Sequence, residues 1–83
     1  MTKHDKLKNL IINDFKANFD YIPIDEDFEA HKNGFYMDYQ DYDLNHLADY
    51  HNSPLIEMAQ LTDDGRCSFI SVYTELSFDD YGI

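Results

Sequence analysis

Carboxylates are the side chains whose number and spacing could do chemistry in this chain, because 17 of its 83 residues are Asp or Glu. The D-x-D-x-N spacing that opens a calcium-binding EF-hand loop occurs at residues 41–45, DYDLN. Such a loop next needs a glycine for its sharp turn and a bidentate glutamate at its twelfth position. His46 and Asn52 occupy those positions, so the pattern does not indicate a calcium site.

Other reactive groups give no pattern that is typical of a metal site or an enzyme. A zinc site needs Cys and His at ligand spacing, and the chain has one Cys, four His and no H-E-x-x-H motif. Catalysis by two carboxylates needs environments that separate their pKa values, and so many acids produce pairs by chance. The sequence also has no glycine-rich phosphate loop and no G-x-S-x-G motif. We therefore expect no cofactor, no metal and no enzymatic activity.

The charge of the chain divides at residue 20. Up to Phe19 there are four Lys and two acids, a formal +2, whereas from Asp20 onward two basic residues stand against fifteen acids, a formal −13. The net charge of −11 exceeds the magnitude of about 2–8 usual for a small domain. Because Lys and Arg bind phosphates and carboxylates repel them, direct nucleic-acid binding is disfavoured. The charge instead predicts a basic partner.

The composition nevertheless predicts a folded chain. Thirteen aromatic residues, with only three Gly and two Pro, argue against disorder despite the charge. The length predicts a single domain over residues 1–83. No apolar run approaches the 18 or so residues of a membrane span, and nothing resembles a signal peptide, so we expect no membrane association and a cytoplasmic location.

Tyrosines interleave the acids between residues 20 and 50. Carboxylates three or four residues apart on a helix lie about 5–6 Å apart, and those two apart on a strand lie about 6–7 Å apart. Phosphates of one nucleic-acid strand rise about 3.4 Å each along the axis and lie off it, so neighbours are also several ångströms apart. A row of acids can therefore present charge at the pitch of a nucleic-acid backbone. Tyrosine suits such a surface because it adds contact area at low entropic cost and has a polar tip.

In size, charge and interleaving of Asp with Tyr, the chain resembles the DNA-mimic inhibitors. These small, very acidic, aromatic-rich proteins are often phage-encoded and occupy the DNA site of restriction, repair, nucleoid or CRISPR proteins. The resemblance implies a stoichiometric, non-catalytic inhibitor of the anti-CRISPR or anti-restriction type. Its partner would be a basic nucleic-acid-binding protein: a nuclease, a CRISPR effector, a restriction protein or a nucleoid protein. An immunity protein against a basic nuclease toxin, or another acidic interaction domain, is the alternative, and a homodimer would extend the row of acids.

The expected partner-binding surface comes from the acidic part of the chain. Its residues are Asp20, Asp25, Glu26, Asp27, Glu29, Tyr36, Asp38, Tyr39, Asp41, Tyr42, Asp43, Asp49, Asp63, Asp64, Asp79 and Asp80. Because the first segment carries lysines, we expect this surface on one side of the molecule only.

The first element that must position these residues is an amphipathic helix over residues 3–18. Leu7, Leu10, Ile11, Phe15 and Phe19 follow the i, i+3, i+4 spacing of one apolar stripe. A threonine at residue 2 and an aspartate at residue 5 fit a capping box at its start. Residues 21–24 are expected to connect this helix to the next element.

The middle of the chain allows two interpretations. Asp25 could cap a short helix over 26–32, which Asn33-Gly34 would end. Residues 35–39 form either a strand or part of a helix, and we expect a helix over 40–51. The helical interpretation depends on the spacing of Phe35, Tyr39, Tyr42, His46 and Tyr50 along one face.

Residues 55–75 are typical of a β-hairpin. Two apolar runs flank an Asp-Gly turn at residues 63–65, and Ser68, Ile70, Val72 and Thr74 share one face of the second arm. Residues 76–83 form a tail that is either ordered or free to bind. The predicted fold class is α+β: the N-terminal helix and one or two further short helices pack on a small antiparallel sheet that contains the 55–75 hairpin.

Overall fold

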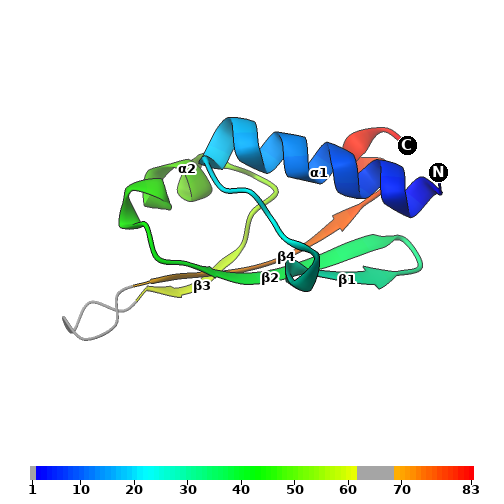
Figure 1. Ribbon diagram of the computed structural model, residues 1–83. Helices are drawn as coiled ribbons and strands as arrows, with labels where there is room; N and C mark the ends of the chain where they lie inside the picture. The colour runs from blue at the N-terminus through cyan, green and yellow to red at the C-terminus, as the bar shows by residue number, and fades with distance from the viewer. Residues whose placement is uncertain (1, 62–68) are drawn as a thin grey trace.

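The chain folds into a layer of helices on one face of an antiparallel sheet, which confirms the α+β class (Figure 1). The computed structural model describes residues 2–61 and 69–83. The four strands have the order β1-β2-β4-β3, with β1 at Phe28–His31, β2 at Gly34–Asp41, β3 at Met58–Leu61 and β4 at Ile70–Ser77. Helices α1 (Lys3–Phe19) and α2 (Leu47–Asn52) lie on the same side of the sheet, and both chain ends lie at one end of the molecule (Figure 1).

Helix α1 forms where the sequence predicts it. The capping box is present: the Asp5 N–H donates to Thr2 Oγ1 at 3.1 Å, and the Thr2 N–H donates to Asp5 Oδ2 at 3.3 Å. The apolar stripe is buried at Leu7, Ile11, Phe15 and Phe19. Leu10, which we assigned to the same stripe, lies at its edge and is 37 % exposed. The stripe therefore fixes α1 over the sheet.

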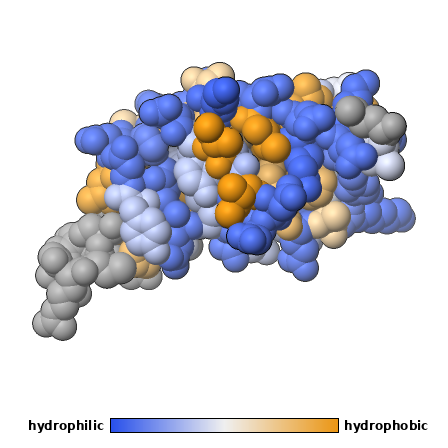
Figure 2. All heavy atoms as spheres, viewed as in Figure 1, coloured by the Kyte–Doolittle hydropathy of each residue, from blue (hydrophilic) through white to orange (hydrophobic). Residues whose placement is uncertain are grey.

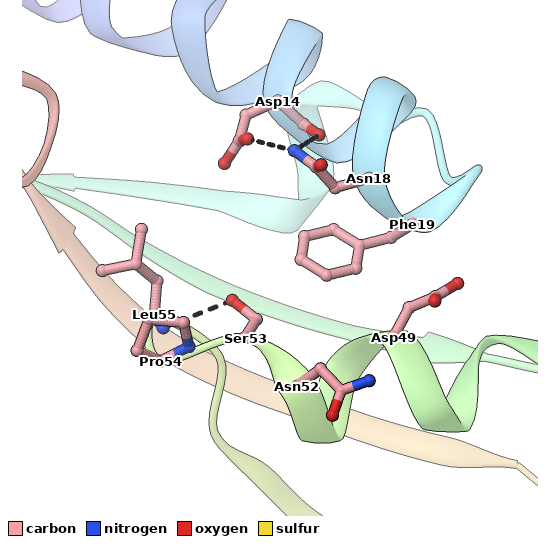
Figure 3. A pocket seen from close by; sticks show the side chains of 8 residues that line it. All are labelled: Asp14, Asn18, Phe19, Asp49, Asn52, Ser53, Pro54 and Leu55. Carbon is pink, nitrogen blue, oxygen red and sulfur yellow. Dashed lines mark hydrogen bonds between the residues drawn. The ribbon is translucent and has the colours of Figure 1, made fainter.

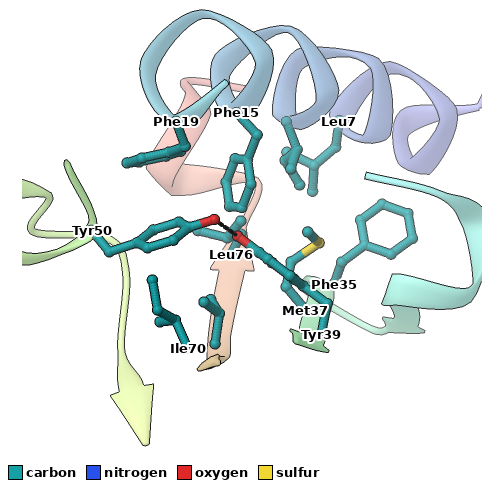
Figure 4. Close-up of a cluster of buried hydrophobic side chains, with 11 residues drawn as sticks. Leu7, Phe15, Phe19, Phe35, Met37, Tyr39, Tyr50, Ile70 and Leu76 are labelled. Atoms are coloured by element: carbon teal, nitrogen blue, oxygen red, sulfur yellow. Dashed lines mark hydrogen bonds between the residues drawn. The ribbon is translucent and has the colours of Figure 1, made fainter. Parts of the chain in front are cut away.

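The core lies between α1 and the inner face of the sheet (Figure 4). Alternate residues of the two central strands point into it, as the period of two requires. From β2 and β4 these are Phe35, Met37, Tyr39, Asp41, Ile70, Val72, Thr74 and Leu76. The face predicted for the second arm of the 55–75 hairpin is thereby confirmed over residues 70–74. Tyr50 from α2 completes the core, and its ring stacks on Phe19 with centroids 5.1 Å apart.

The helix expected over 26–32 is wrong. Residues Asp25–Asp27 form one 3-10 turn and Phe28–His31 form β1, which pairs with β2 through a two-residue loop. Pairing brings Phe28 edge-on against Phe35, with ring centroids 5.3 Å apart, and this contact favours the strand over an isolated short helix. Gly34 serves this hairpin rather than a helix end, because a Cβ there would lie 2.1 Å from the Leu76 carbonyl oxygen of β4.

The helix expected over 40–51 begins too early. Strand β2 continues to Asp41, a 3-10 turn spans Leu44–His46, and α2 spans Leu47–Asn52. The strand interpretation of 35–39 is therefore the correct one. The helical face on which the alternative depended does not exist: Tyr39 lies in the core from a strand, whereas Tyr42 is 68 % exposed.

The hairpin over 55–75 is confirmed in its two arms. Strands β3 and β4 pair antiparallel, with Leu61 opposite Ile70, and the expected turn at 63–65 lies outside the described residues. The tail is ordered: β4 continues through Ser77 and a 3-10 turn follows at Asp79–Tyr81. The Tyr81 hydroxyl donates to Asp14 of α1 at 2.9 Å, which ties the tail to the helix layer.

Candidate protein-binding face

The outer face of the sheet carries four carboxylates and two tyrosines from four segments of the chain. On β2, Tyr36 lies opposite Glu29 of β1 on one side and Glu75 of β4 on the other. On β4, Tyr73 lies opposite Asp38, and its N–H donates to the Glu57 carbonyl at 3.0 Å on the β3 side. Each tyrosine is therefore flanked by two acids. We call these six residues the open face: Glu29, Tyr36, Asp38, Glu57, Tyr73 and Glu75.

The strand period explains why these side chains are exposed. Their neighbours along β2 and β4 point inward, so they must point outward. All four acids are exposed, and Tyr73 is 49 % exposed. In Figure 1 the labelled helices lie on the opposite side of the sheet, and none covers this face. The open face is thus on the side of the sheet that the described residues leave exposed to solvent.

Aromatic contacts order the centre of the open face. The Tyr36 and Tyr73 rings are nearly parallel, 15° apart, with centroids separated by 6.3 Å. His31 lies 4.4 Å from the Tyr36 ring, and its Nε2 lies 3.4 Å from Glu75 Oε2. The Asn33 N–H donates to Nδ1 of the same imidazole at 3.1 Å, so in the neutral ring the proton is on Nε2 and faces Glu75. The Glu75 carboxylate also raises the pKa of the Tyr36 hydroxyl, which keeps it protonated.

The basic residues of α1 lie in the other layer. Lys8 forms an ion pair with Asp25 at 3.3 Å and lies over the Phe28 ring at 5.3 Å. Lys3 lies over the Phe78 ring at 4.9 Å. The open face thus carries a formal −4 from its four acids, whereas the lysines of α1 lie in the helix layer together with further acids such as Asp14 and Asp49.

Three of the expected binding residues belong to the open face: Glu29, Tyr36 and Asp38. Others are exposed but lie elsewhere. Asp20 ends α1, Asp25 and Glu26 lie in the connector turn, Asp49 lies on α2, and Tyr42, Asp43, Asp79 and Asp80 lie beyond the ends of β2 and β4. Asp63 and Asp64 lie outside the described residues. The expected surface is thus divided over several sides of the molecule.

Asp27 and Tyr39 are buried, which corrects their assignment to the binding surface. Asp27 accepts hydrogen bonds from the Tyr21 hydroxyl at 2.8 Å and the Ile24 N–H at 3.0 Å. Tyr39 packs in the core, where its hydroxyl donates to that of Tyr50 at 3.0 Å, and burial raises its pKa. Buried polar groups need hydrogen-bond partners, and these contacts supply them. Both residues therefore contribute to the interior of the fold rather than to its surface.

Asp41 is the third buried residue of the expected surface and receives several hydrogen bonds. Its Oδ2 accepts from the Tyr50 hydroxyl at 2.5 Å and from His46 Nδ1 at 2.7 Å, and its Oδ1 accepts from the Asp43 N–H at 2.9 Å. Burial alone would raise the pKa of Asp41, but these bonds outweigh it and lower the pKa. The hydrogen bond to Asp41 raises the pKa of His46. Its Nε2 lies 3.5 Å from a second carboxylate, Asp43 Oδ2, so both ring nitrogens of this histidine face acids.

Sequence reasoning missed three members of the open face: Glu57, Tyr73 and Glu75. The alternation along 69–75 placed Tyr73 on the face opposite Ile70 and Val72, but its aromatic ring suggested that this face is also partly covered. Nothing local connected it to the acids of residues 29–38, because that connection depends on the pairing of β2 with β4.

A groove of about 410 Å³ separates the end of α1 from α2 (Figure 3). Asp14, Asn18 and Phe19 line it from α1, and Asp49 and residues 52–55 line it from the other side. Asp14 is already engaged by Asn18 and by the Tyr81 hydroxyl. The acid that α1 contributes to the groove is therefore part of the hydrogen bonding that joins the tail to the helix.

Exposed apolar residues gather in the connector between α1 and β1. Ile22 is 61 % exposed and Ile24 is 55 % exposed. Figure 2 shows a small hydrophobic cluster near the middle of the view, bordered by hydrophilic residues. This patch lies beside the acidic 3-10 turn rather than among the six residues of the open face.

Comparison with known proteins gives no relative: no family model, no curated protein and no solved structure matches the chain. Among residues 2–61 and 69–83, no three His, Cys, Asp or Glu side chains come together as a possible metal site. Within the same residues, no helix has the length and apolar character needed to cross a membrane.

Proposed function

We propose that the chain is an acidic inhibitor that occupies the basic nucleic-acid-binding site of another protein, in the manner of a DNA mimic of the anti-restriction or anti-CRISPR type. The observation that carries the proposal is the open face, where four carboxylates flank two tyrosines on a sheet surface that no described helix covers. Inhibition is stoichiometric, because it depends on surface complementarity rather than on a reaction.

The spacing of the acids supports this proposal. Residues directly opposite on neighbouring strands have Cβ atoms about 4.5–5.5 Å apart, and diagonal neighbours lie about 7–8 Å apart. Asp38 and Glu75 are such a diagonal pair, and Glu29 and Glu75 are two strands apart across Tyr36. Negative charges therefore repeat every several ångströms in two dimensions, which is a repeat that arginines and lysines spaced for phosphates can meet.

The charge also supports fast association. Carboxylates collected on one face attract a basic surface at a distance, and such steering raises association rates and makes them fall with added salt. The tyrosines supply contact area that salt does not screen.

Affinity capture from a lysate of the cells that encode the chain, followed by nucleic-acid competition on the captured protein, tests the proposal. We expect a nucleic-acid-binding protein whose labelled DNA or RNA is displaced as the chain is added. A ternary complex, in which the nucleic acid stays bound beside the chain, contradicts the proposal. Capture of a toxin with nuclease activity, blocked away from its substrate site, would instead favour an immunity protein.

Charge reversal locates the surface. Asp38→Lys with Glu75→Lys changes two exposed acids of the open face and should abolish displacement at physiological salt. The matched control is Asp49→Lys with Asp79→Lys, which makes the same change in net charge on the helix layer and should cause a smaller loss. Equal losses in the two variants would show that the net charge, and not the open face, is recognised.

A further inference from the structure

The open face combines planar rings with carboxylates on both sides of each ring. Tyr36 has Glu29 and Glu75 as its cross-strand neighbours, and Tyr73 has Asp38 and Glu57. The two rings are within 15° of parallel. Because His31 already lies 4.4 Å from the Tyr36 ring, the exposed Tyr73 ring is the more open of the two. A cation that lies on Tyr73, at the edge of the pair, has a carboxylate within reach on each side, at a cross-strand spacing of about 4.5–5.5 Å between Cβ atoms.

Arginine matches this arrangement better than lysine. The guanidinium group is planar, stacks on aromatic rings and offers five N–H donors in a fixed fork that pairs with carboxylates. The lysine ammonium is a compact, strongly hydrated point charge that gains less from a ring or from bidentate pairing. We propose that the open face is an arginine-selective docking surface, and that its occupant is an arginine-bearing segment of the basic partner.

The negative charge of the open face favours a basic partner over a second copy of the chain, an anionic lipid surface or nucleic acid. A second copy of the chain would bring one formal −4 face against another, and an anionic lipid surface or nucleic acid would also be repelled. The internal cations that lie over rings, Lys3 and Lys8, are committed to Phe78, Phe28 and Phe35 in the helix layer. Within the described residues Tyr36 contacts Tyr73 and His31, and neither of these lysines lies over Tyr36 or Tyr73, so a cation on the open face would come from the partner.

Two peptides test the inference, which rests on the proposed function. Both have the same length and six basic residues separated by glycines, one with arginine and the other with lysine. Isothermal titration calorimetry with the full chain should show about two- to fivefold tighter binding of the arginine peptide, which is the gain expected for a cation on an exposed ring. Equal affinities, or tighter binding of the lysine peptide, overturn arginine selectivity.

Variants place the selectivity on the open face. Tyr36→Leu with Tyr73→Leu keeps apolar bulk and charge, and should reduce the ratio of the two affinities to about one. Asp79→Asn removes one charge from the helix layer, and should weaken both peptides slightly and equally while the ratio is kept. A ratio that survives the double tyrosine change overturns the assignment to these rings.

Nuclear magnetic resonance of the unmodified chain gives a reading that does not depend on any variant folding. The arginine peptide should shift the ring resonances of Tyr36 and Tyr73 and leave that of the buried Tyr50 in place; shifts confined to other tyrosines overturn the inference.

The arginine preference and the proposed function are refuted by different results. Equal peptide affinities refute the arginine preference alone, whereas a captured partner that keeps its nucleic acid refutes the mimic even if arginine is preferred.

Discussion

Replacing Asp41 by asparagine should be among the most damaging conservative changes in this chain. The carboxylate is 4 % exposed and accepts hydrogen bonds from Tyr50, His46 and the Asp43 N–H. Asparagine has nearly the same shape, but one of its two terminal atoms becomes an NH₂ donor. That donor then faces the Tyr50 hydroxyl and the His46 ring, which both donate to Asp41 in the native chain.

The magnitude follows from the partners that are lost. Each buried polar group left without its hydrogen bond costs about 1–3 kcal/mol, and removing one partner of a buried ion pair costs about 3–5 kcal/mol. Because the side-chain amide can still accept from the Asp43 N–H, we expect Asp41→Asn to lower the free energy of unfolding by about 3 kcal/mol. A domain of this length loses about 4–8 °C in Tm for each kcal/mol, so Tm should fall by roughly 12–24 °C.

Urea denaturation followed by circular dichroism measures this effect, with an unchanged m-value as evidence that the same fold unfolds. Asp38→Asn is the matched control because it removes the same charge from an exposed site on the same strand, and its effect should stay within about 0.5 kcal/mol. Tyr50→Phe removes the hydroxyl that donates to Asp41 and accepts from Tyr39, and should cost about 1–3 kcal/mol. If Asp41→Asn destabilised no more than Asp38→Asn, Asp41 would not organise the interior as we describe.

Two further predictions concern stability. Folding raises the pKa of His46, so the stabilisation from its contact with Asp41 is present below about pH 6.5 and is lost as the pH rises through the raised pKa. Folding lowers the pKa of Asp41, so the stabilisation from its hydrogen bonds is present above about pH 3.9 and is lost as the pH falls through the lowered pKa. Tm should therefore be highest between about pH 4 and 6.5, and His46→Gln should flatten the alkaline side; an unaltered profile in that variant would contradict this assignment. Gly34→Ala places a Cβ 2.1 Å from the Leu76 carbonyl oxygen and should cost about 1–3 kcal/mol or more by thermal denaturation, whereas an unchanged Tm would show that the two strands separate easily.

Local signals were sufficient for the ends of the chain. The capping box and apolar stripe determine α1, and alternation determines β4, because each pattern fits one period only. The middle of the chain was mispredicted because its patterns fit two periods. Phe35 and Tyr39 are spaced for a helix and also alternate as in a strand, and the polar Asp41 at a buried position hides the alternation.

The turn between β1 and β2 shows the same ambiguity. Asn33-Gly34 ends a helix as readily as it serves a hairpin loop, and the choice depends on whether Phe28 finds a partner in β2. Charge patterning predicted one acidic side, but the structure distributes the acids over several sides, and the composition of the open face depends on strand order. Glu57 and Glu75 meet residues 29–38 only because β4 lies between β2 and β3.

A single layer of helices has a consequence for how this chain can vary. The inner residues of β2 and β4 form the core, and the outward residues between them belong to the open face, so folding and the recognition that we propose use alternate positions of the same strands. Substitutions at outward positions leave the core packing intact. If the partner of this chain changes during evolution, the outward residues can therefore be substituted one at a time while each intermediate sequence still folds.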